Sequence, residues 1–332
     1  MSNLNVISVR PQWQQELAQS ISDPSELGAL LRLPDNWITQ NAKARELFPL
    51  RITRYFVGLM RQGDIHDPLL LQVMPNQAEF EQKEGFIADP LEEQNSNHAG
   101  ILHKYKSRVL VILRGGCAIN CRYCFRRHFP YEGNHFGRTQ LQQLVELIQS
   151  DGAINEVILS GGDPLMANDN QLSKVISVLE ELPQLKRLRI HSRLPIVLPS
   201  RLTENLAKRL QQSRLQAILV LHANHPREIS STLKDALEYW ARHGITLLNQ
   251  SVLLRGVNDS ADTLVDLSEA LFDAKVIPYY LHQLDKVAGA SHFAVSDERA
   301  RELERQLRAR LPGFLVPKLV REIAGEASKT PL

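Results

Sequence analysis

The stretch RVLVILRGGCAINCRYC, residues 108–124, joins an apolar run to a loop that holds every cysteine of the chain. The run at 108–113 is apolar after its first arginine, which predicts a buried strand. Cys117, Cys121 and Cys124 follow it within eight residues, and the sequence has no fourth cysteine to pair with them. Thiols gathered in one loop predict a metal site directly after this strand.

The spacing of the three cysteines allows more than one metal. Iron-sulfur clusters usually take four thiolates, so three would leave one iron open to an outside ligand. A zinc ion is the alternative, because His128 lies four positions after Cys124 and would complete a set of three thiolates and one imidazole. Thiols that are only small buried apolar groups are a third alternative, which their clustering disfavours.

Short apolar runs alternate with longer amphipathic stretches from residue 100 onward. These stretches are expected to be helices, at about residues 139–149, 171–181, 201–212, 228–242 and 261–272. Six runs are expected to be buried strands, at residues 108–113, 156–160, 187–191, 217–221, 245–248 and 277–281. Strands that alternate with helices indicate a parallel sheet or barrel. A polar or glycine-rich position closes or follows each run, namely Cys117, Gly161, His191, His222, Gln250 and Asp285. The carboxyl ends of barrel strands meet at one mouth, whereas a doubly wound sheet gathers its ligand at one switch point. The sequence therefore predicts an α/β fold built as a six-stranded partial (β/α) barrel.

The rest of the chain is expected to surround this barrel. Residues 1–95 lack the alternating rhythm and contain helical patches, which predicts an N-terminal helical cap. Residues 96–295 carry the barrel itself. Residues 296–332 begin with a charged amphipathic helix, and the apolar stretch at 314–320 is a candidate final strand in a C-terminal tail.

Composition excludes several broad classes of function. The 332 residues include 39 basic and 37 acidic side chains, and a net charge of +2 gives no general attraction to nucleic acid or to a membrane surface. No stretch approaches the roughly 20 apolar residues of a membrane span, and the polar first 20 residues do not look like a secretory signal. Clustered thiols without a disulfide partner suit the reducing cytoplasm, which is the expected compartment.

The motif CxxxCxxC, with an aromatic residue before its last cysteine, resembles that of the radical S-adenosylmethionine (SAM) superfamily. The resemblance implies that Cys117, Cys121 and Cys124 bind a 4Fe-4S cluster whose open iron binds SAM. The stretch SGGDP after the second run resembles the glycine-rich motif of the same superfamily, although a Gly-Gly pair alone is typical of a tight turn. The residues of this motif that would contact SAM are Gly161, Gly162 and Asp163.

A narrower resemblance covers most of the chain from residue 103 to residue 331. The stretches HKYKSRVL, CAINCRYCFRR, SGGDPL, HANHPREI, QSVLLRGVND, PYYLHQLD and SKTP are similar, in this order, to those of the lysine 2,3-aminomutase family. The family implies an isomerase that moves the α-amino group of lysine to the neighbouring carbon and yields β-lysine. It also implies three cofactors: a 4Fe-4S cluster, SAM and pyridoxal 5'-phosphate. A radical SAM aminomutase for another amino acid is the alternative within the superfamily.

By the same resemblance, Lys329 would bind pyridoxal phosphate covalently, while Lys104, Arg108 and Gln250 would hold its phosphate and His222 would line the SAM site. Charge-assisted donors suit a phosphate dianion. Without the family, Lys104 and Arg108 would be read as a solvated basic segment. Lys329, close to the end of the chain, would be read as an exposed charge.

The substrate contacts implied by the family follow charge logic. Arg126, two positions after the last cysteine, would clamp the carboxylate of the amino acid. Asp285 and Glu322 would face the terminal ammonium of lysine. The family usually has aspartate at the second of these positions, so Glu322 is a departure with a longer arm. Two acids still fit a cationic side chain.

The short C-terminal tail, which stops after SKTP, resembles that of a bacterial aminomutase that provides (R)-β-lysine for modification of elongation factor P. This implies an electron donor and an elongation factor P ligase as partners. Two rival functions remain at this stage: a zinc-stabilised binding module that uses the same cysteines, and a radical enzyme for nucleic acid or peptide. The latter would be expected to lack Lys329 and the paired acids and to carry a more basic surface.

Overall fold

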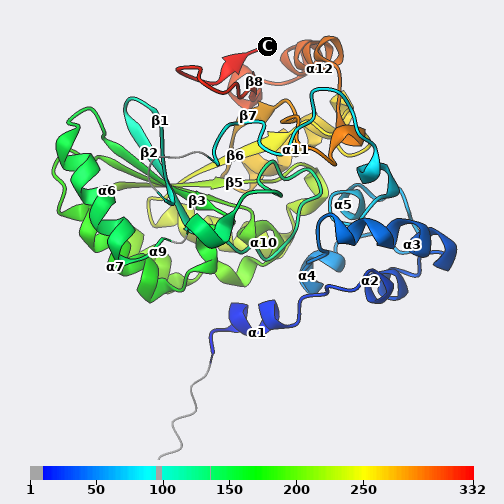
Figure 1. Cartoon of the computed structure of the whole chain (residues 1–332), viewed down its shortest axis with the longest axis horizontal. Helices are drawn as coiled ribbons and strands as arrows, with labels where there is room; N and C mark the ends of the chain where they lie inside the picture. The colour runs from blue at the N-terminus through cyan, green and yellow to red at the C-terminus, as the bar shows by residue number, and fades with distance from the viewer. Residues whose placement is uncertain (1–9, 95–98, 135) are drawn as a thin grey trace, which may run out of the picture.

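The computed structural model describes residues 10–94, 99–134 and 136–332. Its centre is one sheet whose nine strands follow each other in chain order (Figure 1). The strands are β1 (Ile101–Tyr105), β2 (Arg108–Arg114), β3 (Glu156–Gly161), β4 (Arg187–Ser192), β5 (Gln216–Leu221), β6 (Thr246–Val252), β7 (Ile277–His282), β8 (Lys318–Arg321) and β9 (Thr330–Pro331). Neighbours from β2 to β8 are parallel, whereas β1 and β9 pair antiparallel at the two edges. Among the described strands, β1 and β9 form the two ends of the sheet and do not pair with each other, so the barrel is open. This confirms the predicted α/β partial barrel.

Strands β2 to β7 correspond to the six apolar runs, and β8 falls on the candidate final strand. Strand β1 was not predicted, because its polar second half, His103–Lys104–Tyr105, gives no apolar alternation. It is an edge strand, paired on one side only with β2, and such strands commonly carry charge. This strand therefore brings Lys104 to the barrel wall.

Helices connect the parallel strands as right-handed crossovers are expected to do. They are α6 (Arg138–Ser150), α7 (Asp169–Glu180), α9 (Glu204–Gln211), α10 (Ser231–Arg242) and α11 (Ala261–Asp273), with α12 (Asp297–Arg310) before β8. Two of them begin three residues later than the sequence suggested, at Glu204 and Ser231. In both cases the residue before the helix, Thr203 or Ser230, accepts a backbone N–H from the first turn at 3.2 or 3.1 Å. The residues upstream form short 3-10 turns that start at a proline.

The N-terminal region is helical and packs against the barrel (Figure 1). Its helices are α1 (Gln12–Ala18), α2 (Pro24–Leu31), α3 (Asp35–Ala42), α4 (Arg54–Val57) and α5 (Pro68–Leu71). Trp13, Leu27 and Phe56 of these helices belong to the same buried apolar cluster as Val109 and Leu159 of the barrel strands. The N-terminal helices and the barrel thus share one core. No helix in the described part of the chain is long and apolar enough to cross a membrane.

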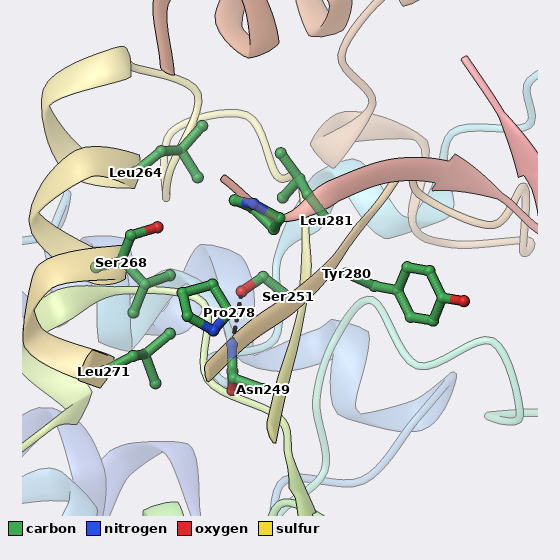
Figure 2. Close-up of a pocket in the computed structure, with 10 residues that line it drawn as sticks. Asn249, Ser251, Leu264, Ser268, Leu271, Pro278, Tyr280 and Leu281 are labelled. Carbon is green, nitrogen blue, oxygen red and sulfur yellow. Dashed lines mark hydrogen bonds between the residues drawn. The ribbon is translucent and has the colours of Figure 1, made fainter. Parts of the chain in front are cut away.

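Strand alternation separates an outer, apolar face of the sheet from an inner face that carries polar side chains. In β4, Leu188 and Ile190 join the core beneath the helices, which leaves Arg189 and His191 on the other face. The same alternation applies in β7, where Leu281 packs with α11 and α12. Figure 2 shows the ring of Tyr280 on the opposite side of β7 from α11. We call the space bounded by this inner face the lumen.

Candidate active site

The cysteine loop follows β2 and is fixed by the N-terminal region. Asn120 N–H donates to Arg51 O at 2.9 Å, and Arg122 N–H donates to Gln72 O at 2.8 Å. The Arg122 side chain is fully buried and donates to Glu79 at 2.8 Å and to the carbonyl of Phe48 at 2.7 Å. The charge of this guanidinium is tolerated in a buried position because its N–H donors have acceptors. The loop that carries the three cysteines is therefore held by residues up to 78 positions earlier in the chain.

The three thiols lie close enough to influence one another. Burial raises the pKa of each, well above the usual range for Cys117 and to about 11 for Cys124, and charge on neighbouring thiols adds to the shift for both. Such thiols are protonated at neutral pH without a metal, and ligation to iron removes the proton. The cysteine loop thus brings three thiols close together, as the predicted metal site requires.

The zinc alternative needs His128 beside the three cysteines. Across residues 10–94, 99–134 and 136–332, no three His, Cys, Asp or Glu side chains are arranged around a single ion. The Nε2 atom of His128, the predicted fourth zinc ligand, lies 3.3 Å from the carbonyl of Ala288.

Glycine is required at positions 161 and 162 because the end of β3 packs on the backbone that leads to the cysteines. Gly161 has φ +122°, and a Cβ there would lie 2.5 Å from Arg114 O. A Cβ at Gly162 would lie 2.7 Å from the carbonyl oxygens of Gly115 and Gly116. These distances leave no space for any side chain. The glycine-rich motif therefore places the β3 end directly beside the cysteine loop.

Asp163 ties the ends of β3 and β4 together. Its carboxylate accepts hydrogen bonds from Ser192 Oγ at 2.7 Å, from the backbone N–H groups of Arg193 and Leu194, both at 2.9 Å, and from that of Leu165 at 3.0 Å. Burial raises its pKa to about 6, although these hydrogen bonds act in the opposite direction. A carboxylate with four donors from the chain acts by fixing the neighbouring backbone. Its predicted contact with SAM stays a prediction, and the structure favours an indirect one.

His222 and Gln250 are in direct contact, although the family resemblance assigned them to different cofactors. Gln250 lies inside β6 and not after it, and its Nε2 is 2.9 Å from Nε2 of His222. Burial, together with the charges of Arg193 and Arg126, lowers the pKa of His222 to about 3. The neutral imidazole therefore accepts the amide N–H through Nε2. This contact joins the residue that follows β5 to the inner face of β6.

Two further histidines of the inner face were not given a role by the sequence. His191 and His282 each have a buried Nε2 with no hydrogen-bond partner among the described residues. Burial lowers the pKa of both well below the usual value, so both rings are neutral at neutral pH. The charge of Lys329 acts on both rings. Buried polar atoms are normally paired, and those that are not point to a ligand. The sequence signal was their place at the ends of β4 and β7.

Arg189 is a third residue that the sequence did not single out. It shares the inner face of β4 with His191 and forms an ion pair with Glu156, while its Nε is buried without a partner in the described structure. Arg108 lies at the level of Glu156 in the β2–β3 ladder. A strand rises about 3.3 Å per residue, so Arg108 is roughly 20 Å from Arg114 at the cysteine end of β2. Arg108 therefore lies at the opposite end of β2 from the cysteine loop.

A chain of alternating charges joins several predicted site residues. Arg126 Nε lies 2.6 Å from Glu93, and Glu93 lies 3.0 Å from Lys104 Nζ. Lys104 lies 3.9 Å from Glu322, which forms an ion pair with Lys329. One network of ion pairs thus joins the N-terminal region, the cysteine loop, β1 and the tail. Glu93 was missed by the sequence, because one acid in an irregular segment carries no periodic signal.

The two acids assigned to the lysine ammonium are in different states. Burial raises the pKa of Asp285 to about 7, and the charge of Glu322 raises it while Lys329 lowers it. Burial also acts to raise the pKa of Glu322, but Lys329 and Lys104 more than offset this and lower it. The hydroxyl of Tyr105 donates to Glu322 at 2.9 Å. Glu322 is therefore ionised at neutral pH, while Asp285 titrates there.

A small hollow outside the lumen is not a ligand site. It lies between α11 and the outer face of β6 and β7, where Asn249 Nδ2 donates to Ser251 Oγ at 2.9 Å (Figure 2). Its volume of about 10 Å³ is at the lower limit for one water molecule. We interpret it as a packing gap.

Comparison with known proteins agrees with this geometry. The radical SAM superfamily pattern matches residues 111–267. The L-lysine 2,3-aminomutase of Escherichia coli (strain K12) is 52% identical over 324 residues, which is 97% of this chain and 95% of that protein. The enzyme of the same name from Haemophilus influenzae is 49% identical over 98% of this chain and 96% of that protein. A radical SAM methyltransferase from Sphaerobacter thermophilus has a similar fold, with a TM-score of 0.50 and 20% identity over 67% of this chain and 68% of its own.

Proposed function

This chain belongs to the lysine 2,3-aminomutase family of the radical SAM superfamily, and on that premise we propose that it converts L-lysine to β-lysine with pyridoxal phosphate bound at Lys329. Membership makes it an isomerase that uses a 4Fe-4S cluster and SAM. When bound, the cluster and SAM supply radical chemistry, and pyridoxal phosphate activates the migrating amino group. The protein's task is to orient the reacting groups and to exclude water.

The observation that carries this proposal is the position of Lys329. The antiparallel pairing of β8 and β9 returns the tail to the sheet, with Arg321 opposite Thr330. The Lys329 side chain is only 21% exposed, pairs with Glu322, and has its Nζ 5.8 Å from the centre of the Tyr280 ring. A lysine near the end of a chain is normally solvated. This one is directed to the lumen, where a covalent cofactor would be needed.

Unpaired polar atoms of the lumen support a bound phosphate ester of this kind. Arg108 and Arg189 provide cations at one end, and Nε of Arg189 lacks a partner in the described structure. The Nε2 atoms of His191 and His282 offer further polar contacts beside Lys329. A phosphate dianion binds best to such charge-assisted donors. We assign Lys104, Arg108 and Gln250 to the cofactor as the family implies, and add Arg189.

The substrate would lie between the two ends of the charge network. Arg126 would receive the carboxylate, while Glu322 and Asp285 would receive the terminal ammonium. Lysine carries both groups at opposite ends, so an anion-binding and a cation-binding site in one lumen favour it over a substrate without a second amine. For the cysteines, we assign the cluster to Cys117, Cys121 and Cys124, with Gly161, Gly162, Asp163 and His222 around SAM.

The product's use is a separate part of the proposal. The two relatives at about 50% identity are similar to this chain over 95% and 96% of their own length. We propose that the chain works in the cytoplasm with an electron donor and passes (R)-β-lysine to a ligase that modifies elongation factor P. Chiral analysis of the product, followed by mass measurement of elongation factor P incubated with the ligase, tests this step. Production of only the (S) isomer would refute it.

A further inference from the structure

Glu93 is a buried carboxylate that joins two cations with different proposed ligands. Its Oε2 accepts a hydrogen bond from Arg126 Nε at 2.6 Å, and its Oε1 accepts one from Arg126 Nη2 at 3.2 Å. The ammonium of Lys104 lies 3.0 Å from Oε1. Glu93 is 6% exposed and Arg126 is 7% exposed. One carboxylate therefore fixes the guanidinium and the ammonium relative to each other.

The pairing with Glu93 determines which side of the Arg126 guanidinium is free. A guanidinium has five N–H donors in a rigid planar fork. Glu93 takes the side formed by Nε and Nη2. Nη1 donates to Ser160 Oγ and Gly161 O, both at the long distance of 3.2 Å. The end of the fork, between Nη1 and Nη2, carries one N–H of each nitrogen, and it is the side on which a second carboxylate finds the N–H of Nη2 that Glu93 does not use.

The backbone around Glu93 is itself fixed on two sides. The carboxylate of Asp89 accepts the N–H of Glu93 at 3.1 Å and the N–H of Gln94 at 3.0 Å. Lys104 Nζ donates to Leu91 O at 3.2 Å as well as pairing with Glu93. Burial acts to raise the pKa of Glu93, but the charges of Arg126 and Lys104 lower it overall, which keeps this carboxylate ionised. Glu93 is therefore a rigid anchor and not a mobile surface acid.

We propose that Glu93 is a positioning residue for substrate binding. It binds the Nε–Nη2 side of the Arg126 guanidinium, so that the edge between Nη1 and Nη2 receives the carboxylate of the amino acid. The same contact to Lys104 sets the spacing between the carboxylate site and the phosphate site. This inference rests on the proposed function, in which those two cations bind lysine and pyridoxal phosphate. Glu93 touches neither ligand and acts through the two cations.

The test compares two ligands that differ only in the carboxylate. Binding of L-lysine and of 1,5-diaminopentane is measured by calorimetry on the anaerobic protein loaded with cluster, SAM and pyridoxal phosphate. We expect Glu93→Gln to weaken L-lysine binding roughly tenfold to hundredfold, as for the loss of a charge-assisted hydrogen bond. Binding of 1,5-diaminopentane, which has no carboxylate for Arg126, should change by less than about twofold. Glu93→Asp keeps the charge but shortens the arm, so its effect should be in the same direction and smaller.

A double-mutant cycle then shows whether Glu93 acts through Arg126. In an Arg126→Gln background, Glu93→Gln should weaken L-lysine binding by less than about twofold, because the two residues act as one unit. The matched control is Glu180→Gln, which removes a carboxylate that pairs with Arg209 at 2.8 and 2.9 Å on the outer helices. This control should not change the affinity for either ligand.

Two results would overturn the inference. Equal weakening of both ligands by Glu93→Gln would show a general structural defect and refute the positioning role alone. Failure of the wild-type protein to bind L-lysine would refute the proposed function and the inference with it. If Glu93→Gln does not fold, Glu93→Asp gives the same comparison between the two ligands, and equal effects on both would again refute the role.

Discussion

The ammonium of Lys329 forms an ion pair with the carboxylate of Glu322, which lies on the other side of the β8–β9 turn. Tyr105 of β1 donates to the same carboxylate at 2.9 Å, so both edge strands of the sheet meet at Glu322. The residue expected to bind the substrate ammonium therefore has an ammonium partner within the protein itself. On the proposed function, covalent attachment of pyridoxal phosphate to Lys329 would change this pair and could free Glu322 for the substrate ammonium.

Replacement of Lys329 by alanine should abolish pyridoxal phosphate attachment and β-lysine formation, because the other amine near Glu322, that of Lys104 at 3.9 Å, is paired with Glu93. The cofactor's visible absorbance band and the amount of β-lysine are the measurements. The iron and sulfide content should be unchanged, since the cysteines lie in a separate loop. The matched control is Lys318→Ala, which removes an exposed lysine of β8 in the same tail. Full turnover by Lys329→Ala would refute the role of this residue.

The affinity for L-lysine should rise with pH between about 6 and 8, because a carboxyl binds an ammonium only when it is ionised. Burial and the charge of Glu322 raise the pKa of Asp285 to about 7. Calorimetric titration at a series of pH values measures this effect, and Asp285→Asn should remove most of the slope. If the affinity of Asp285→Asn for L-lysine rose with pH as steeply as that of the wild type, the titrating group would not be Asp285.

The raised pKa of Asp285 should make the free energy of unfolding decrease with pH, whereas the affinity for L-lysine increases. Between the ordinary aspartate pKa of about 4 and about 7, the folded protein holds a proton on Asp285 that the unfolded chain has released. The free energy of unfolding should therefore fall as the pH rises through this range, as far as Asp285 is concerned. Denaturant titrations of the wild type and of Asp285→Asn, compared at about pH 4.5 and pH 7, should show a smaller decrease in the variant. An equal decrease in both would contradict the shift.

Replacement of Gly162 by alanine should disturb the junction between β3 and the cysteine loop. The new Cβ would lie 2.7 Å from backbone atoms of Gly115 and Gly116, which cannot rotate away. We expect a loss of about 1–3 kcal/mol in the free energy of unfolding, as for other overpacked sites, together with weaker SAM binding. Gly152→Ala is the control, because nothing lies within 4 Å of a Cβ there. Equal SAM affinity in the two variants would contradict this role of Gly162.

Removal of the Arg122 side chain should destabilise the cysteine loop. This guanidinium is fully buried and pairs with Glu79, which is also buried. Loss of one partner of a buried pair costs about 3–5 kcal/mol, and the lower end of this range applies here because Arg127, 2.8 Å from Glu79, still pairs with that carboxylate. We expect Arg122→Met to lower the free energy of unfolding by this amount and to reduce iron incorporation. Arg209→Met, which breaks a more exposed pair with Glu180, should cost about 1 kcal/mol or less and retain full iron content.

The fold was predictable where the sequence has strong periodic signals. Apolar runs such as residues 156–160 located β2 to β7, although β6 continues to Val252, four residues beyond the predicted run at 245–248. The helix starts near Glu204 and Ser231 were less accurate, since a proline turn precedes each cap. Strand β1 was missed because its stability comes from pairing with β2 and not from its own apolar residues.

The site was predictable only as a set of residues and not as an arrangement. The cysteines and the Gly-Gly turn were found from the motif, and their closeness follows from parallel strand ends. The Glu93–Arg126 contact joins residues 33 positions apart, and no local pattern in either segment indicates it. Gln250 and His222 were assigned to separate cofactors, although they touch, because residue roles alone contain no distances.

The central claim is best tested by one anaerobic assay of the purified protein with L-lysine, SAM, pyridoxal phosphate and a chemical reductant. The product is derivatised with a chiral reagent and measured by mass spectrometry. We expect β-lysine to accumulate in the wild-type protein, to depend on added pyridoxal phosphate, and to be absent in Lys329→Ala. Cleavage of SAM without formation of β-lysine, or formation of β-lysine by Lys329→Ala, would contradict the account.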